Sequence, residues 1–206
     1  MMEEPNSYRD ELDKNMWTTK GSRYNGSRRC KRKHEISTAC IAILTLYIIG
    51  LNLSQFIPAL NIQPNLSRYI TFSTLIASMG ILILSLLEGS KNYLVKSERL
   101  YNCANEINKL YGKIRMFKYN CNVGDDSIMG IREAYNELLL RYPDNHEPID
   151  YDLFRVQYRK KDFDISLGPA MWIRLKSVIL MYWLYILLIV PLAISLFYLL
   201  YHIAKP

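Results

Sequence analysis

The stretch that decides the fold is residues 69–118, YITFSTLIASMGILILSLLEGSKNYLVKSERLYNCANEINKLYGKIRMFK. Its first part, Tyr69 to Leu87, carries no charge and is long enough to cross the hydrocarbon core of a membrane as a helix. No proline interrupts the remainder, so a helix can continue beyond the membrane. We therefore predict one continuous helix that spans the membrane and extends into the cytoplasm as a stalk.

The second half of this stretch contains an apolar seam. Its members recur in alternating steps of three and four residues: Tyr93, Ser97, Leu100, Ala104, Ile107, Tyr111 and Ile114. Such spacing lines one face of a helix and favours packing against another helix. We predict that this stalk seam packs against a helix of the same chain or of a second copy, and that it contributes to a homo-oligomer.

The 206-residue chain is 50% hydrophobic, and its apolar residues are concentrated in three blocks. A soluble domain would disperse them over amphipathic elements, so the composition indicates a membrane protein. The other two blocks are Ile36–Ile57, which Pro58 ends, and the uncharged Val178–Tyr201. We expect an all-α membrane protein with four parts: a basic segment at 1–35, a two-span hairpin at 36–87, a cytoplasmic helical stalk domain at 88–167, and a third transmembrane helix with a tail at 168–206.

Charge is distributed unevenly around these blocks. Residues 1–35 hold nine Lys and Arg, residues 58–68 hold one, and residues 91–176 hold fifteen. Positive charge is retained on the cytoplasmic side of a membrane. We therefore expect a multi-pass membrane protein with the amino terminus and residues 88–176 in the cytoplasm and the carboxy terminus outside.

A basic run directly precedes the first span. Such a run can bind nucleic acid, but beside a membrane helix it sets orientation and contacts anionic lipid headgroups. We favour the lipid contact and expect no direct nucleic-acid binding. The chain before about Thr19 is expected to be loose. The membrane-surface residues are Arg28, Arg29, Lys31, Arg32 and Lys33.

Two further cytoplasmic helices are expected beyond the stalk. A turn at residues 120–126, broken by Gly124, precedes a helix at 127–142 that folds back on the stalk. A shorter helix follows at about 150–161, and Gly168 and Pro169 begin the last helix. The apolar face of the fold-back helix has a 3.6-residue period: Ile128, Ile131, Tyr135, Leu138, Leu139 and Tyr142.

The sequence offers no convergent set of catalytic or metal-binding residues. Motifs of the forms GxSxG, HExxH and the phosphate-binding loop are absent, and the cysteines lack metal-site or disulfide spacing. We expect no enzyme activity, no cofactor and no metal, and reduced cysteines at positions 30, 40, 103 and 121. His146 allows two interpretations, a divalent metal site or a solvated loop whose carboxylates cap the next helix, and we favour the cap. The carboxylates concerned are Asp144, Glu147, Asp150 and Asp152.

Polar side chains also follow a three-and-four spacing on the second span. Such a stripe can line a water-filled path, or its hydroxyls can bond to their own helix and to neighbouring helices. Two spans cannot enclose a pore, so a conducting path requires several copies. The candidate pore-lining residues are Thr71, Thr74, Ser78, Ser85 and Glu88.

Short sequence words around the hairpin resemble a known family. A basic cluster precedes a tight hairpin, and LLEGSKNY at 86–93 and ERLY at 98–101 follow it. This arrangement resembles the SLATT proteins, the two-transmembrane effector domains associated with SMODS nucleotidyltransferases and SLOG sensors. The word NHEPIDY at 145–151 and the third span resemble the SLATT branch found beside reverse transcriptases.

The resemblance covers about residues 20–165 and implies a membrane effector of a prokaryotic anti-phage defence system. SLATT proteins are predicted to oligomerise into pores that kill or arrest an infected cell when a partner senses infection. It thus implies a sensor partner, such as a reverse transcriptase or a nucleotide-second-messenger system. The alternative function is a non-conducting membrane anchor or scaffold that recruits a cytoplasmic partner through the stalk.

Overall fold

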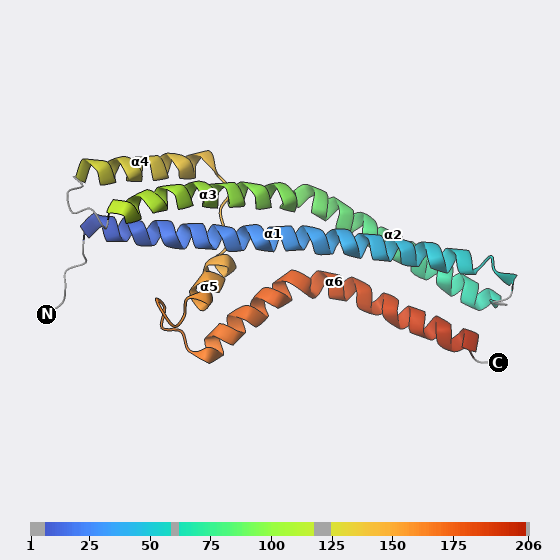
Figure 1. The fold of residues 1–206 in the computed structure, drawn as a ribbon. Helices are drawn as coiled ribbons and strands as arrows, with labels where there is room; N and C mark the ends of the chain where they lie inside the picture. Colours follow the sequence, from blue (N-terminus) through green and yellow to red (C-terminus); the bar gives the residue numbers. More distant parts are fainter. Residues whose placement is uncertain (1–6, 59–61, 118–124, 205–206) are drawn as a thin grey trace. The chain divides into compact units, whose positions relative to one another are not determined.

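The computed structural model describes residues 7–58, 62–117 and 125–204, and within these ranges all regular structure is helical (Figure 1). The all-α class predicted from the sequence is therefore confirmed. The helices in chain order are α1 (Ser7–Ser54), α2 (Pro64–Lys91), α3 (Tyr93–Phe117), α4 (Asp125–Arg141), α5 (Pro148–Gln157) and α6 (Leu167–Ala204).

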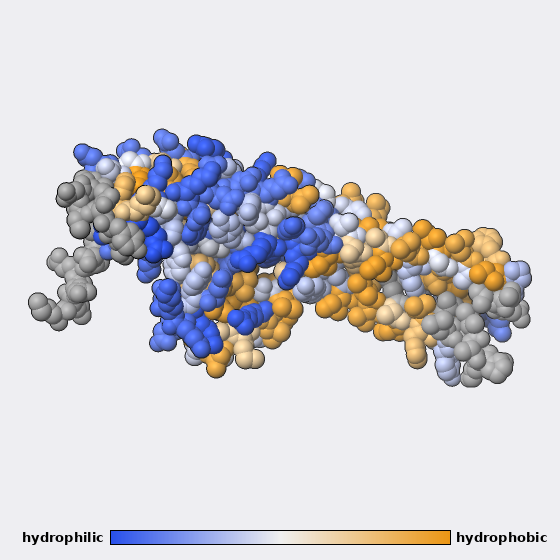
Figure 2. Space-filling view, in the orientation of Figure 1, coloured by the Kyte–Doolittle hydropathy of each residue, from blue (hydrophilic) through white to orange (hydrophobic). Residues whose placement is uncertain are grey.

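The chain divides into two compact units, each built from separate parts of the sequence. The polar unit comprises Met1–Lys31 and Tyr93–Val178, and the membrane unit comprises Arg32–Asn92 and Ile179–Pro206. Among the described residues, three helices are long and apolar enough to cross a membrane, within Tyr8–Ser54, Pro64–Phe117 and Leu167–Val190. In Figure 2 hydrophilic residues dominate the visible surface of the polar unit, whereas hydrophobic residues dominate that of the membrane unit.

The core of the polar unit forms between the beginning of α1, α3 and α4. It contains buried apolar side chains from all three helices: Leu12, Met16, Cys103, Ile107, Ile114, Ile128, Ile131, Tyr135 and Leu138. The predicted packing of the fold-back helix on the stalk is thus confirmed. The expectation that the chain is loose before Thr19 is wrong, because Leu12 and Met16 supply an apolar face that α3 and α4 bury. The turn predicted at 120–126 lies outside the described residues up to position 124.

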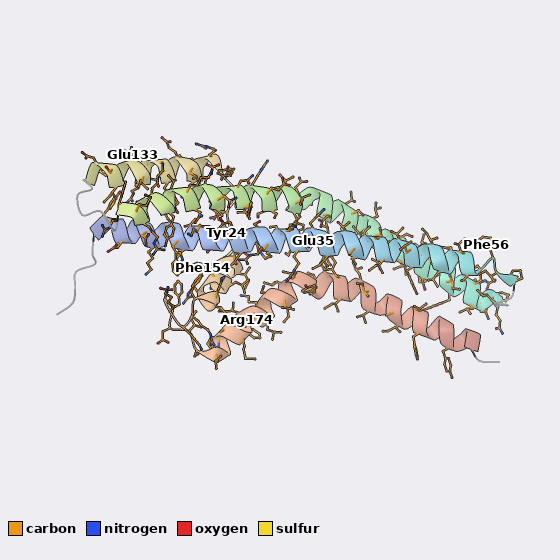
Figure 3. All side chains as sticks on the ribbon, viewed as in Figure 1. Tyr24, Glu35, Phe56, Glu133, Phe154 and Arg174 are labelled. Carbon is orange, nitrogen blue, oxygen red and sulfur yellow. The ribbon has the colours of Figure 1, made fainter. Side chains whose placement is uncertain are left out.

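Helix α5 packs on α1 where α1 lacks a side chain. A Cβ atom added at Gly21 would lie 2.1 Å from the Phe154 ring, so the ring occupies space that any other residue would need. Figure 3 labels Phe154 beside α1. The ring of Trp17 also meets Phe154 edge-on, with centroids 4.7 Å apart. Aromatic packing on a bare helix surface therefore holds α5 in place.

The predicted continuous helix from 69 to 118 is interrupted at one residue. Asn92 adopts the left-handed conformation, with φ 44° and ψ 46°, and ends α2 by donating its N–H to the Glu88 carbonyl over 3.2 Å. Helices commonly end in this way, usually at Gly and sometimes at Asn. The expectation of continuity was wrong because it considered only glycine and proline as helix breakers, and the break falls at an asparagine.

In the membrane unit, α1 and α2 pack together near the hairpin through Leu51 and Ile70. Farther along, Cys40 and Leu44 of α1 meet Leu84 of α2 and Tyr185 of α6. Most other large side chains of the spans point outward, and Phe72, Leu82 and Leu86 are each at least 60% exposed. An apolar surface of this kind is suited to contact with lipid or with other transmembrane helices.

Candidate functional site

The hydroxyl stripe of α2 bonds to its own helix. Thr71 Oγ1 donates to the Ser67 carbonyl over 3.0 Å, Thr74 Oγ1 to the Thr71 carbonyl over 3.0 Å, and Ser78 Oγ to the Thr74 carbonyl over 2.8 Å. These bonds satisfy the hydroxyl donors within the membrane, as one of the two interpretations of the stripe requires. Each oxygen still has lone pairs with which it can accept a bond from water.

Burial separates the stripe into two groups. Thr74 is only 5% exposed, so the chain itself covers it. Thr71, Ser78 and Ser85 are exposed along the edge of the covered face. Only this second group is open to a neighbouring copy or to water, and we call it the open hydroxyl edge.

Glu88, the last candidate of the stripe, forms a contact between α1 and α2. One of its carboxylate oxygens lies 2.8 Å from Nδ1 of His34, and its side chain is 15% exposed. The neighbouring Tyr185 of α6 donates its hydroxyl to the Lys33 carbonyl over 3.4 Å. Polar groups from three helices therefore gather at this end of the membrane unit.

The stalk seam is buried within the polar unit. Leu100, Ala104 and Ile107 have no exposed surface, and Ile114 is 1% exposed. Tyr93 and Tyr111, at the edges of the seam, are partly buried. A single copy of the chain therefore covers most of the seam. The predicted role of the seam in assembly stays a prediction, because the structure contains one copy only.

The basic run does not lie wholly on the surface. Arg28, Lys31 and Arg32 are exposed and Lys33 is half-buried, whereas the side chain of Arg29 is only 6% exposed. The placement of Arg29 on a lipid-facing surface is therefore corrected: its guanidinium is paired inside the polar unit.

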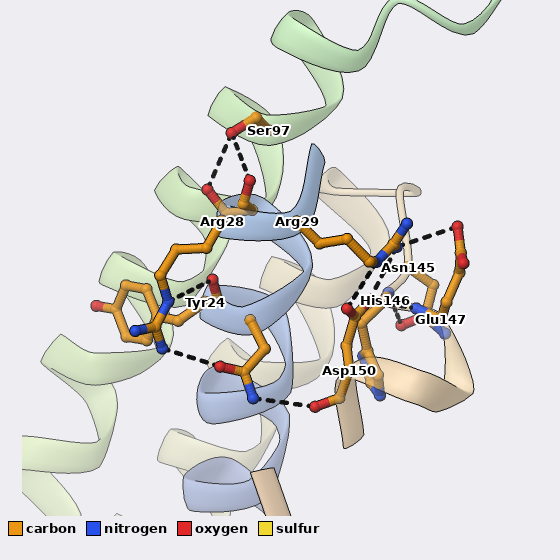
Figure 4. Close-up of polar contacts among 10 residues, drawn as sticks. Tyr24, Arg28, Arg29, Ser97, Asn145, His146, Glu147 and Asp150 are labelled. Atoms are coloured by element: carbon orange, nitrogen blue, oxygen red, sulfur yellow. Dashed lines mark hydrogen bonds and ion pairs between the residues drawn. The ribbon is translucent and has the colours of Figure 1, made fainter. Parts of the chain in front are cut away.

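Arg29 pairs with Asp150 at the start of α5 (Figure 4). Its Nε and Nη2 donate to the two carboxylate oxygens over 2.8 and 3.0 Å, and Nη2 also lies 3.0 Å from Oε1 of Glu147. Asp150 is completely buried. A paired fork of this kind has a fixed geometry, so it aligns α5 on α1. A Cβ atom at Gly26 would lie 3.0 Å from Asp150 Oδ2, so glycine there leaves room for the carboxylate.

Two further contacts complete the surroundings of Asp150. The backbone N–H of Glu147 donates to Oδ2 over 2.9 Å, and the Asn25 side-chain amide donates to the Asp150 carbonyl over 3.0 Å. The predicted capping role of the loop carboxylates is thus confirmed for Asp150. Burial acts to lower the pKa of Arg29, but the hydrogen bond and charge of Asp150, with the charge of Glu147, outweigh it and raise that pKa.

His146 lies beside this pair (Figure 4). No group of three or more His, Cys, Asp or Glu side chains with metal-binding geometry occurs in the described ranges. Its Nδ1 is buried without a hydrogen-bond partner among the described atoms. Burial lowers the pKa of His146, the charge of Arg23 lowers it further, and the charge of Asp150 opposes them. Folding therefore favours the neutral form of the imidazole.

The polar unit contains a second buried arginine that sequence reasoning did not identify. Arg23 is 4% exposed and donates from Nη1 to the sulfur of Cys103. Burial raises the pKa of the Cys103 thiol, although Arg23 acts to lower it. The cysteines at 30, 40 and 103 are unpaired and buried, and Cys121 lies outside the described residues.

These features define an all-helical membrane protein in which a two-span hairpin is attached to a polar helical unit. The chain belongs to the SMODS and SLOG-associating 2TM effector domain family 5, also written SLATT_5, whose family model matches residues 6–198. No curated protein and no solved structure matched the chain. The SLATT resemblance is therefore confirmed, and the link to the branch beside reverse transcriptases stays a prediction.

Proposed function

We propose that this protein is a prokaryotic anti-phage effector that oligomerises into a pore and disrupts the inner membrane when a partner triggers it. The family supplies the role of a two-transmembrane effector associated with defence systems. The observation that carries the pore is the open hydroxyl edge, Thr71, Ser78 and Ser85, on a span whose other outward side chains are apolar. Several copies that place this edge inward would enclose a polar path.

The polar unit is the part that a sensor partner engages in this proposal. A reverse transcriptase or a nucleotide-second-messenger system is the expected kind of partner, and the polar unit and amino terminus are proposed to lie in the cytoplasm. The seam remains a proposed assembly surface. Because one copy already buries it, assembly there would require α3 to exchange a helix partner with a second copy.

The pore is tested by replacing Ser78 and Ser85 together with leucine. The loss of two hydroxyls from the open edge should reduce the current per channel in planar bilayers at least fivefold while crosslinked oligomers persist. The matched control is Thr45→Leu, because Thr45 is an exposed hydroxyl on α1 that bonds to the Ile41 carbonyl over 2.8 Å. Unchanged conductance in the double variant would contradict the proposed path.

The second candidate function is a non-conducting anchor or scaffold. The observation that favours it is that the hydroxyls of Thr71, Thr74 and Ser78 donate hydrogen bonds to carbonyls of their own helix. Such bonds are usual in packed transmembrane helices. Membrane potential distinguishes the two functions in cells that express the protein with its neighbouring genes. Growth arrest with the potential retained would favour the scaffold, whereas collapse of the potential before arrest would favour the pore.

A further inference from the structure

The polar unit contains an open cleft that the proposed pore does not use. Its volume is about 450 Å³, within the usual range for small-molecule sites. The beginning of α1, the end of α3 and the segment that follows α5 form its walls. That last segment turns sharply, because the backbone N–H groups of Lys161 and Asp162 both donate to the Tyr158 carbonyl, over 3.1 and 3.0 Å.

Positive charge converges on this cleft from three segments. Lys14, Arg115 and Lys161 line it, and two carboxylates, Asp13 and Asp162, offset part of their charge. Lys20 adds a further cation next to the lining, with Nζ 3.6 Å from the centroid of the Tyr111 ring. The guanidinium of Arg115 lies 5.7 Å from the same centroid.

Two of these cations, Lys20 and Arg115, lie close together around the Tyr111 ring. Burial lowers the pKa of Lys20, and the charge of Arg115 lowers it further, while Asp13 opposes both. With four cations and two carboxylates, the site has excess positive charge. An anionic ligand would reduce the repulsion between the cations, and the excess positive charge would stabilise the bound ligand.

Aromatic rings form the remaining wall. The ring of Trp17 is nearly parallel to that of Phe163, with 7° between their planes and centroids 6.1 Å apart, and it meets Tyr158 edge-on at 4.9 Å. These contacts fix the orientation of the rings before a ligand arrives. Fixed aromatic rings next to cationic side chains are the combination that recognises a nucleobase together with its phosphates.

We propose that this cleft binds a free nucleotide, with its phosphates against Arg115 and Lys161 and its base against the aromatic wall. The assignment requires both kinds of side chain. Cations without aromatic rings would suit any phosphate, and aromatic rings without cations would suit an uncharged ligand. The proposal concerns the polar unit alone and does not depend on whether the spans conduct.

Calorimetric titration of the full-length protein in lipid nanodiscs tests the proposal. The probes are ATP, GTP, CTP and UTP, together with tripolyphosphate, which lacks a base, and the four nucleosides, which lack phosphate. At least one nucleotide should bind at least tenfold more tightly than tripolyphosphate and than its own nucleoside. Arg115→Gln should weaken that binding at least tenfold, because it removes a lining cation.

Lys113→Gln is the matched control, because it removes the same charge from an exposed residue of α3 that does not line the cleft. It should change Kd less than twofold. Lys161→Gln replaces Arg115→Gln if the melting temperature shows that the latter is misfolded. Absence of binding by all four nucleotides to folded protein would overturn the proposal, as would equal binding by the lining variants. Tripolyphosphate binding as tight as nucleotide binding would also overturn it, because the site would then be one for simple anions.

Discussion

Arg29 and Asp150 are both withdrawn from water, so each depends on the other for the interactions that hydration would supply. The sequence did not reveal this pair, because the two residues are 121 positions apart and Arg29 lies within a run of surface-type cations. The word NHEPIDY at 145–151 pointed to the right segment, but only through family resemblance. Capping by Asp150 was predictable, since carboxylates are common in the first turn of a helix.

We expect Asp150→Asn to destabilise the polar unit by up to about 3–5 kcal/mol, because it leaves the buried Arg29 charge with only the half-exposed carboxylate of Glu147 as its partner. Urea unfolding in detergent, followed by hydrogen exchange of α5, measures this loss. Asp152→Asn is the control: Asp152 is only loosely paired with Arg155, at 3.9 Å and partly exposed, and should contribute less than about 1 kcal/mol. Equal losses in the two variants would show that the buried pair adds no special stability.

The neutral His146 gives a prediction for pH. Because its pKa is lowered on folding, the unfolded chain binds more protons below about pH 6.5, and acid therefore favours unfolding. The contribution of His146 to folding is fully present above that pH and falls as the pH decreases. His146→Gln should reduce the decrease in melting temperature between pH 7.5 and pH 5.5. A decrease as large as that of the unchanged protein would exclude His146 as its source.

At the scale of helices, periodicity predicted well and local backbone geometry predicted poorly. The apolar face of α4 correctly predicted its packing against α3, because apolar residues with a 3.6-residue period lie on one face of a helix and that face is buried. The helical beginning of α1 was missed, because buried residues such as Leu12 and Met16 are few in this polar segment. The break at Asn92 was also missed, because a left-handed residue depends on local geometry that no spacing rule describes.

The approach of α5 to α1 gives a prediction at this scale. Gly21→Ala should destabilise the polar unit by about 1–3 kcal/mol, because the new Cβ would lie 2.1 Å from the Phe154 ring. Gly112→Ala is the matched control: it lies within α3, nothing approaches its Cβ position within 4 Å, and alanine favours helix by up to about 1 kcal/mol. Urea unfolding should therefore give opposite signs for the two variants. Stabilisation by both would mean that α5 does not press on Gly21.

At the scale of the whole chain, composition predicted three apolar helices, and the part of the chain that the structure describes contains three that are long and apolar enough to span a membrane. The sequence could not predict which side chains of the spans stay exposed, because exposure depends on how the helices pack: Thr74 is buried and Ser78 is exposed on the same helix. Orientation rests on the distribution of charge and is open to direct measurement.

We predict that the hairpin tip and the carboxy terminus face outward. Single cysteines introduced at positions 61 and 206, in a background in which the four native cysteines are replaced by serine, should react with a membrane-impermeant maleimide in intact spheroplasts. A cysteine at position 124 should react only after permeabilisation, because the excess positive charge places that segment inside. Labelling of position 206 only after permeabilisation would remove the third span from the proposed topology.

The polar unit is assembled from two stretches of chain, and this discontinuity constrains biosynthesis. Its first part, Met1–Lys31, leaves the ribosome before the hairpin, whereas its partners in α3, α4 and α5 emerge only after both hairpin spans. Until then Leu12 and Met16 have no apolar surface to bury against. Ribosome-bound chains that end before α3 should therefore lose their amino-terminal segment to protease, while longer chains should keep it. Synthesis of the hairpin thus precedes folding of the polar unit, so a folded polar unit always belongs to a chain whose hairpin has already been made.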